Sequence, residues 1–404
     1  MLIYYPALLI FIFLNIIIFL LNKDLYFQKF LFLPFYTISL FLFILDVYKI
    51  YNNISFEGVL NFYKNILLYL ILFITFFYFN NKTCQYRLLF YNTKKIVLIT
   101  KFLVWINLLI TFYFLFELSS KTKTSIIDLY LKKPYYTELN LITNSLLGNI
   151  LKTKIFNTIL IIGLIIHKVN YKNKSFYLFL SFLLILSTQQ KGDFFIIFIS
   201  SLHILLFKIN LNFKYLVNVI TTLFISVFFI FALTYSFYKS ANVEISITKK
   251  IYEYTTFPIA GSTFLKKDKE KDILNYNTFQ PLYDKLNIVE TLDPLNYEKY
   301  YKINNILVGN VAGFFAPFVY DFGYIGAVFF VFILIIYLSI VENLKKNIII
   351  VVYYSILISF LDFSFFGNYF TNSIFIEQTF AFIIFYLLNS FKYPKLKLKD
   401  ERNI

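Results

Sequence analysis

Long apolar runs recur along the whole chain, separated mostly by short polar connections. An apolar run of about 20 residues is long enough to cross a bilayer as a helix. The pattern predicts eleven such helices, at 2–21, 30–46, 65–79, 97–117, 145–166, 176–189, 193–207, 215–238, 323–341, 348–362 and 374–390. A β-barrel would instead show short segments of alternating character. The chain is therefore expected to be an all-α polytopic membrane protein with about eleven transmembrane helices.

Four of these predicted spans have unusual features. The second contains Pro34, which is expected to interrupt it, and only Gln189–Gly192 separates the sixth from the seventh. The first run is too long for the core of a signal peptide and has no small-residue cleavage site, so we expect it to be retained as a span.

One long polar connection divides the chain into four parts. We expect an N-terminal bundle of about eight helices at 1–238, a large loop at 239–322, a C-terminal bundle of three helices at 323–390 and a basic tail at 391–404. The large loop holds most of the polar groups available for chemistry.

The distribution of Lys and Arg predicts the orientation. Eighteen of these residues lie in the tail and in one alternate set of connections, against nine in the other short connections. Because positive charge favours the cytoplasmic side, the C-terminus is predicted to be cytoplasmic and the large loop to face outward.

Composition narrows the classes further. The 404 residues are 59% hydrophobic and 15% charged, with a mean hydropathy of +0.69. The formal net charge of +16 is located largely beside the membrane segments, which argues against a nucleic-acid partner. Cys84 is the only cysteine, and the two histidines, His167 and His203, are far apart, so the sequence predicts neither a metal site nor a cofactor.

The first part of the large loop combines aromatic, hydroxyl and charged side chains. It includes Lys250, Glu253, Tyr254, Lys266 and Lys267. Tyr and Phe rings stack on the C–H faces of sugars while polar groups bind the sugar edges, so this mixture suits a glycan. Aromatic residues also gather at the headgroup level of many membrane proteins, and that alternative stays open.

The lysine in the short turn before the seventh span, Lys191, has two interpretations. Lys191 is predicted to lie at the outer membrane surface, against the usual charge bias. It either pairs with a phosphate at the headgroup level or extends to the interface beside Asp193.

Ionisable residues within or beside other spans are weaker candidates. His203 is expected to be a neutral, hydrogen-bonded histidine, and Lys101 to reach its nearby interface. Asp362 and Glu377, which flank the last outer connection, could face the same outer cavity as Asp321.

The most specific pattern is the segment 309–326, at the end of the large loop. It contains Asn310 and Tyr320, followed by Asp321-Phe322-Gly323 and Gly326. Pro317 is expected to prevent a regular helix through the middle, and Asp321 to serve as the N-cap of the following span.

On these residues the chain resembles the Wzy-type O-antigen and oligosaccharide repeat-unit polymerases. The resembling positions are Asn310-Val311, Phe315, Tyr320, Asp321-Phe322-Gly323 and Gly326. Lys191-Gly192 and the start of the large loop are similar to further features of that family, and the layout is similar over nearly the whole chain. One departure is that no arginine is predicted to face outward, although many family members hold the lipid diphosphate with arginines.

The resemblance implies an integral membrane glycosyltransferase with a GT-C-like architecture in the bacterial inner membrane. It would transfer a glycan from undecaprenyl diphosphate to another lipid-linked repeat unit on the periplasmic side, with a chain-length regulator protein as a further partner. Asp321 and Glu253 would be the catalytic carboxylates. The residues that would bind substrate are Lys191, Lys250, Tyr254, Lys266, Lys267, Asn310 and Tyr320.

Two other functions remain open at this stage. An O-antigen ligase would share the layout and the donor, but the segment 310–326 favours the polymerase. A lipid-linked glycan flippase should carry several charges within its central spans and show related halves. Neither feature is apparent in the sequence.

Overall fold

The computed structural model describes most of the chain as helices. It describes residues 2–50, 56–82, 93–123, 125, 146–169, 172–188, 191–208, 256, 258–263, 301–303, 306–308, 314–344, 347–365, 369–371 and 373–390. The helices are α1 (Tyr5–Leu21), α2 (Lys23–Lys29), α3 (Phe32–Ile50), α4 (Phe56–Phe79), α5 (Thr93–Thr122), α8 (Leu146–Leu151), α9 (Lys154–Ile166), α10 (Lys174–Thr188), α11 (Lys191–Lys208), α15 (Ala316–Asn343), α16 (Ile348–Asp362) and α17 (Ser373–Ser390), with 3-10 turns η1 (Leu2–Tyr4), η2 (Phe363–Phe365) and η3 (Tyr369–Thr371).

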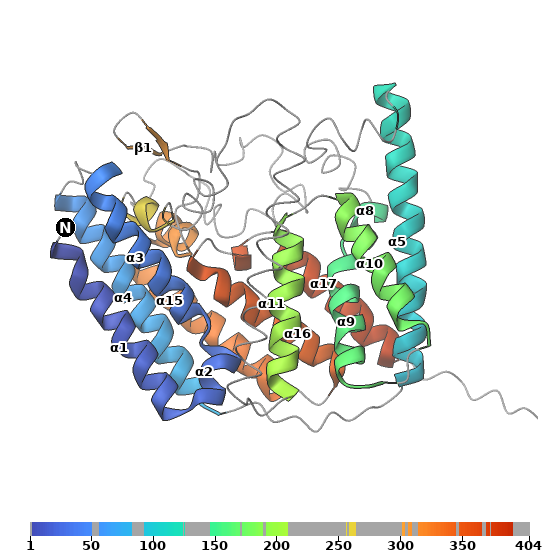
Figure 1. Cartoon of the computed structure of the whole chain (residues 1–404), viewed down its shortest axis with the longest axis horizontal. Helices are drawn as coiled ribbons and strands as arrows, with labels where there is room; N and C mark the ends of the chain where they lie inside the picture. The colour runs from blue at the N-terminus through green and yellow to red at the C-terminus, as the bar shows by residue number, and fades with distance from the viewer. Residues whose placement is uncertain are drawn as a thin grey trace, which may run out of the picture.

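The helices form one bundle (Figure 1). Across the bundle, helices α1, α3 and α4 lie on the left side of the view, α5 and α10 lie on the right side, and α11, α16 and α17 lie between them. Helix α16 is the centre of the packing, because all of its residues are buried. It packs against α11, α9, α15 and α17. The many buried Phe, Ile and Leu side chains form one main apolar cluster that includes residues from both halves of the chain.

The second predicted span, 30–46, is not interrupted at Pro34, since α3 continues through it, and the break lies at the start of the span. Helices α2 and α3 meet at a bend of 73°, in the break between Lys29 and Phe32. Pro34 is the third residue of α3, where a helix tolerates proline because the first-turn N–H groups have no partner within the helix. The Asn22 side chain caps the start of α2 by accepting a hydrogen bond from the Leu25 amide, at 3.0 Å.

The helical and apolar character agrees with a membrane protein. Within the described part of the chain, three helices, α4, α5 and α15, are long and apolar enough to cross a membrane, and the bent pair α2 and α3 raises this number to four. Five further apolar helices are shorter. A described helix overlaps ten of the eleven predicted spans, and the predicted span 215–238 lies outside the described residues. Large apolar side chains on α4, α5 and α15 remain exposed, as a lipid-facing surface requires.

Several contacts join helix ends that the alternation of spans assigns to the same side. Lys95 donates to the Asn389 carbonyl at 3.4 Å, and Lys208 donates to the Ile166 carbonyl. On the opposite side, the Tyr63 hydroxyl donates to the Ile3 carbonyl. In each case, the two helix ends that are in contact are ones that the order of the predicted spans assigns to the same side.

Most of the large loop lies outside the described residues. Its described parts are Thr256, a short buried segment at 258–263, a two-stranded antiparallel hairpin of β1 (Tyr301–Ile303) and β2 (Ile306–Val308), in which Lys302 pairs with Leu307, and residues 314–322, which already enter α15. The Asn61 side chain of α4 donates to the Thr263 carbonyl at 3.3 Å, which attaches the start of the loop to the bundle.

Candidate functional site

Four charged side chains meet at one end of the bundle, and we call Lys152, Lys154, Asp193 and Glu377 the charged cluster. Lys154 and Asp193 pair at 3.1 Å, and their side chains are only 5% and 2% exposed. Lys152 and Glu377 pair at 2.9 Å and are partly buried. Glu377 is also close enough for its charge to act on Asp193, so the two pairs form one electrostatic unit.

Local helix geometry explains why these side chains converge. Helix α8 ends at Leu151, and the short break at Lys152 and Thr153 places Lys154 at the start of α9. Asp193 lies in the first turn of α11, where the helix dipole favours a carboxylate. Glu377 lies in the second turn of α17, so three helices contribute to the charged cluster from their N-terminal ends.

Burying charged side chains in this way costs free energy. Removing two ions from water has a desolvation penalty that their attraction often fails to exceed, so an apolar pair of similar size is commonly as stable or more stable. A buried pair is therefore weak evidence for a stabilising role. Ionisable groups inside a membrane bundle are by default candidates for function.

Tyr369 lies close to the charged cluster, and Gln378 is a separate buried polar side chain on α17. Tyr369, in η3 between α16 and α17, is half-buried close to Asp193, and its loss of solvent together with that negative charge raises its pKa to about 12. Its hydroxyl therefore stays protonated at neutral pH. Gln378 follows Glu377 on α17 and is fully buried. Neither its amide nitrogen nor its amide oxygen finds a hydrogen-bond partner among the described residues. A buried amide without partners typically loses about 1–3 kcal/mol, so a polar ligand near Gln378 would be stabilised.

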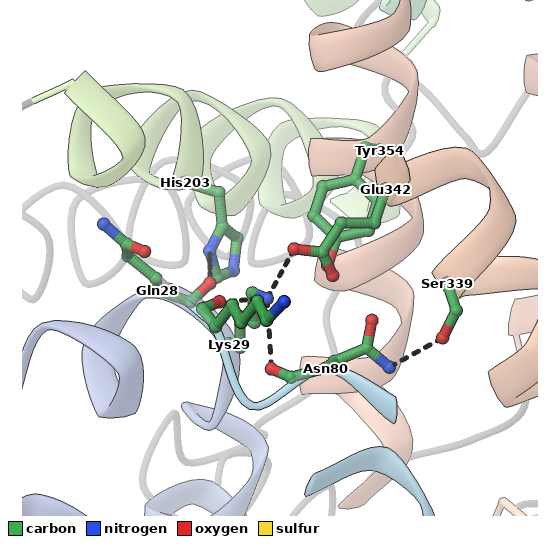
Figure 2. A network of polar contacts seen from close by, with 8 residues as sticks. Gln28, Lys29, Asn80, His203, Ser339, Glu342 and Tyr354 are labelled. Carbon is green, nitrogen blue, oxygen red and sulfur yellow. Dashed lines mark hydrogen bonds and ion pairs between the residues drawn. The ribbon is translucent and has the colours of Figure 1, made fainter. Parts of the chain in front are cut away.

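A second polar network lies at the other end of the bundle (Figure 2). The fully buried Lys29 ammonium pairs with Glu342 at 2.5 Å and donates to the carbonyls of Asn80, at 3.1 Å, and Lys82, at 2.6 Å. Glu342 also accepts from the Tyr354 hydroxyl at 2.9 Å, and the Asn80 amide donates to Ser339 at 3.1 Å. All three ammonium protons of Lys29 thus have an acceptor, which makes this network a tie between α2, α4, α15 and α16.

The predicted site residues fall into three groups. Lys191 is the first residue of α11, two positions before Asp193, although its side chain lies outside the described residues. Tyr320 and Asp321 are half-buried on α15, which packs against α4 and is a different part of the bundle from α9 and α11 (Figure 1). The remaining predicted residues lie outside the described part of the chain: Lys250, Glu253, Tyr254, Lys266, Lys267 and Asn310.

Two expectations about the segment before the ninth span are wrong. Helix α15 begins at Ala316, with Phe315 as its N-cap, so Asp321 lies inside the helical stretch and is not its cap. Pro317 lies in the first turn of α15, where its fixed φ angle favours the start of a helix instead of preventing one.

The two glycines of the Phe-Gly-x-x-Gly pattern have a clear structural role. Gly323 has φ 70° and ψ −176°, which kinks α15 and which an L-residue adopts only with strain. A Cβ at Gly326 would lie 2.1 Å from the Cβ of Phe322. The kink therefore brings Phe322 onto the backbone of Gly326, and both positions require glycine.

The structure also corrects and extends the weaker candidates. Lys29, one of the eighteen basic residues on the side predicted to be cytoplasmic, is fully buried. His203 is buried and hydrogen-bonded as expected, but its partner is Asp362, at 2.5 Å. Glu377 pairs with Lys152. The sequence signal for the charged cluster was lysine on the side that positive charge usually avoids, but no sequence pattern paired those lysines with particular acids.

Among the described residues, no group of three or more His, Cys, Asp and Glu side chains is arranged to hold a metal ion. Comparison of the chain with protein-family models, with curated proteins and with solved structures finds no match.

Proposed function

We propose that this chain is a glycosyltransferase of the bacterial inner membrane that polymerises lipid-linked oligosaccharide repeat units on the periplasmic side. The observation that carries the proposal is the charged cluster, whose buried lysines lie at the end of the bundle that the charge bias predicts to face outward. The resemblance of residues 310–326 to the Wzy-type polymerases supports the same function.

The diphosphate leaving group develops negative charge, which cationic side chains can stabilise. The acceptor hydroxyl attacks carbon one of the donor sugar, the bond from that carbon to the diphosphate oxygen breaks, and the diphosphate leaves with the electron pair. Lys152, Lys154 and Lys191 are proposed to stabilise that negative charge. Lysine acts here as a point charge and lacks the bidentate geometry of arginine.

Carboxylates would activate the acceptor. Asp321 and Glu253 remain the residues proposed to take the hydroxyl proton. Lys250, Lys266, Lys267, Tyr254, Asn310 and Tyr320 remain the residues proposed to bind the glycan and its diphosphate. A chain-length regulator protein remains the proposed protein partner, and undecaprenyl diphosphate the proposed lipid carrier.

The test is the surface-glycan profile of the source bacterium after deletion of the gene and complementation with variants. We expect the deletion to leave single repeat units and no ladder, and Lys154→Ala, Lys191→Ala and Asp321→Ala each to fail to restore the ladder. Lys121→Ala is the matched control, because Lys121 is also predicted to face outward but is 63% exposed and paired within one helix with Glu117. An unchanged ladder after deletion would remove the protein from this pathway.

A lipid-linked glycan transporter is the second candidate, favoured by the buried pairs Lys29–Glu342 and Lys154–Asp193 between helices of the bundle. Charges in such positions often mark substrate paths. A transporter defect would leave single units on the cytoplasmic face, whereas a ligase defect would leave long polymer on its lipid carrier. The location and length of the accumulated glycan therefore separate the three functions.

A further inference from the structure

A histidine and an aspartate form a contact deep in the bundle that the proposed reaction does not use. His203 of α11 and Asp362, the last residue of α16, are 0% and 1% exposed, and Nε2 lies 2.5 Å from Oδ2. With fifteen residues, α16 spans only about 22 Å, which is less than the hydrocarbon thickness. Asp362 therefore ends the helix inside the bundle.

The surroundings restrict where the protons of this pair lie. The other ring nitrogen, Nδ1, lies 3.1 Å from the Gln28 carbonyl oxygen. A carbonyl oxygen only accepts hydrogen bonds, so Nδ1 carries a proton and donates it. Nε2 faces a carboxyl oxygen, and a contact of 2.5 Å requires one proton between the two atoms.

The backbone around the pair is the break between α2 and α3. Gln28 is near the C-terminal end of α2, where carbonyl groups lack partners within the helix, and its side chain donates to the Leu206 carbonyl at 3.1 Å. The backbone of Phe32, the first residue of α3, lies close to the Asp362 carboxyl group. The carbonyl side of the break thus faces the imidazole, which favours positive charge on His203. The Asp362 carboxyl group is buried and its Oδ1 has no hydrogen-bond partner among the described residues, so the contact of Oδ2 with Nε2 is its main stabilising interaction.

We propose that His203 and Asp362 are a proton-binding dyad that forms an imidazolium–carboxylate pair and holds the broken α2–α3 segment against α11 and α16. With the proton bound, the dyad is neutral overall. Without it, a net negative charge remains among buried groups. The nearby Lys29 ammonium does not compensate for that charge, because Glu342 of α15 pairs with it and Tyr354 of α16 donates to the same carboxylate.

The chain suits a direct measurement, because it has only two histidines. Full-length protein labelled with ¹⁵N-histidine would be examined by NMR in lipid at pH 7.5, and a His167→Gln variant would assign the two sets of signals. His167 is an internal control for a neutral ring, because burial and the charge of Lys208 lower its pKa to about 4. We expect both ring nitrogens of His203 to carry protons while His167 carries one.

Two variants test the dyad further. Asp362→Asn should remove the Nε2 proton signal of His203 and keep the Nδ1 proton, because the Gln28 carbonyl is unchanged. Ser200→Ala is the matched control, since the Ser200–Ser359 hydrogen bond of 3.1 Å joins the same two helices without charge. It should leave the His203 signals as they are.

A wild-type spectrum with a neutral His203 ring would overturn the proposal, and so would an Asp362→Asn spectrum identical to the wild type. If Asp362→Asn fails to fold, the wild-type spectrum alone decides. These outcomes do not depend on glycan synthesis, so the dyad and the proposed function fail or stand separately.

Discussion

Breaking the buried pair of the charged cluster should destabilise the protein far more than breaking an exposed pair. Lys154→Met leaves the Asp193 carboxylate, which is 2% exposed, without its ammonium partner at 3.1 Å. Leaving one charge of a buried pair uncompensated typically costs about 3–5 kcal/mol. Lys121→Met breaks the pair with Glu117, in which Lys121 is 63% exposed, and should cost less than about 1 kcal/mol.

The double variant Lys154→Met/Asp193→Leu separates the cost of the lone charge from the value of the pair. Replacing both charges by apolar side chains removes the uncompensated carboxylate, so most of the loss should be regained. The assay is the melting temperature of the full-length protein in detergent, followed by size-exclusion chromatography. The reasoning is refuted if Lys154→Met lowers the melting temperature no more than Lys121→Met, or if the double variant is no more stable than Lys154→Met.

The same double variant tests the role of the charged cluster in function. It should fold and yet fail to restore the glycan ladder, because the cation proposed to stabilise the diphosphate is absent. A stable double variant that restores a full ladder would show that Lys154 is not part of the clamp.

Three further predictions concern other parts of the molecule. Gly326→Ala should cost about 1–3 kcal/mol by overpacking, because its Cβ would lie 2.1 Å from that of Phe322. Gly163→Ala, with its nearest contact at 3.4 Å, is the control and should be close to neutral in the same melting assay. Lys29→Met should cost about 3–5 kcal/mol by leaving Glu342 without its cation, and equal melting temperatures for Lys29→Met and wild type would contradict the network in Figure 2. His167 has its pKa lowered from 6.5 to about 4 by burial and by Lys208, so the folded state binds fewer protons than the unfolded state between these values. Stability should therefore fall as the pH falls through that window, and His167→Gln should show a smaller loss of melting temperature between pH 7 and pH 5.

The helices were largely predictable because lipid-facing and core side chains are both apolar. Near-continuous apolar runs mark α1, α5 and α17 wherever they pack, and their bounds differ from the prediction by a few residues. The predicted span 145–166 is less regular, since it divides into α8 and α9 at Lys152 and Thr153. Nothing in the apolar pattern marks that break. The break nevertheless positions Lys152 and Lys154, the two lysines of the charged cluster.

Helix starts were harder to predict, because their signals have two meanings. A proline stops a helix when it lies in the interior and favours one when it lies in the first turn. Pro34 and Pro317 both lie in first turns. The break between α2 and α3 therefore comes before Pro34, and α15 begins seven residues before the kink at Gly323. The carboxylate of Asp321 has the properties of an N-cap, but the helix had already begun.

By itself, the sequence determined that the chain is a bundle of apolar helices, because hydrophobic length and period depend only on neighbouring residues. It also predicted that some lysines lie on the side that positive charge usually avoids. Only the tertiary structure decided which charges meet: Lys154 with Asp193, Lys152 with Glu377, Lys29 with Glu342 and His203 with Asp362. These partners come from helices far apart in the chain, and burial, which makes each pair consequential, is a property of the packed bundle and not of any local sequence.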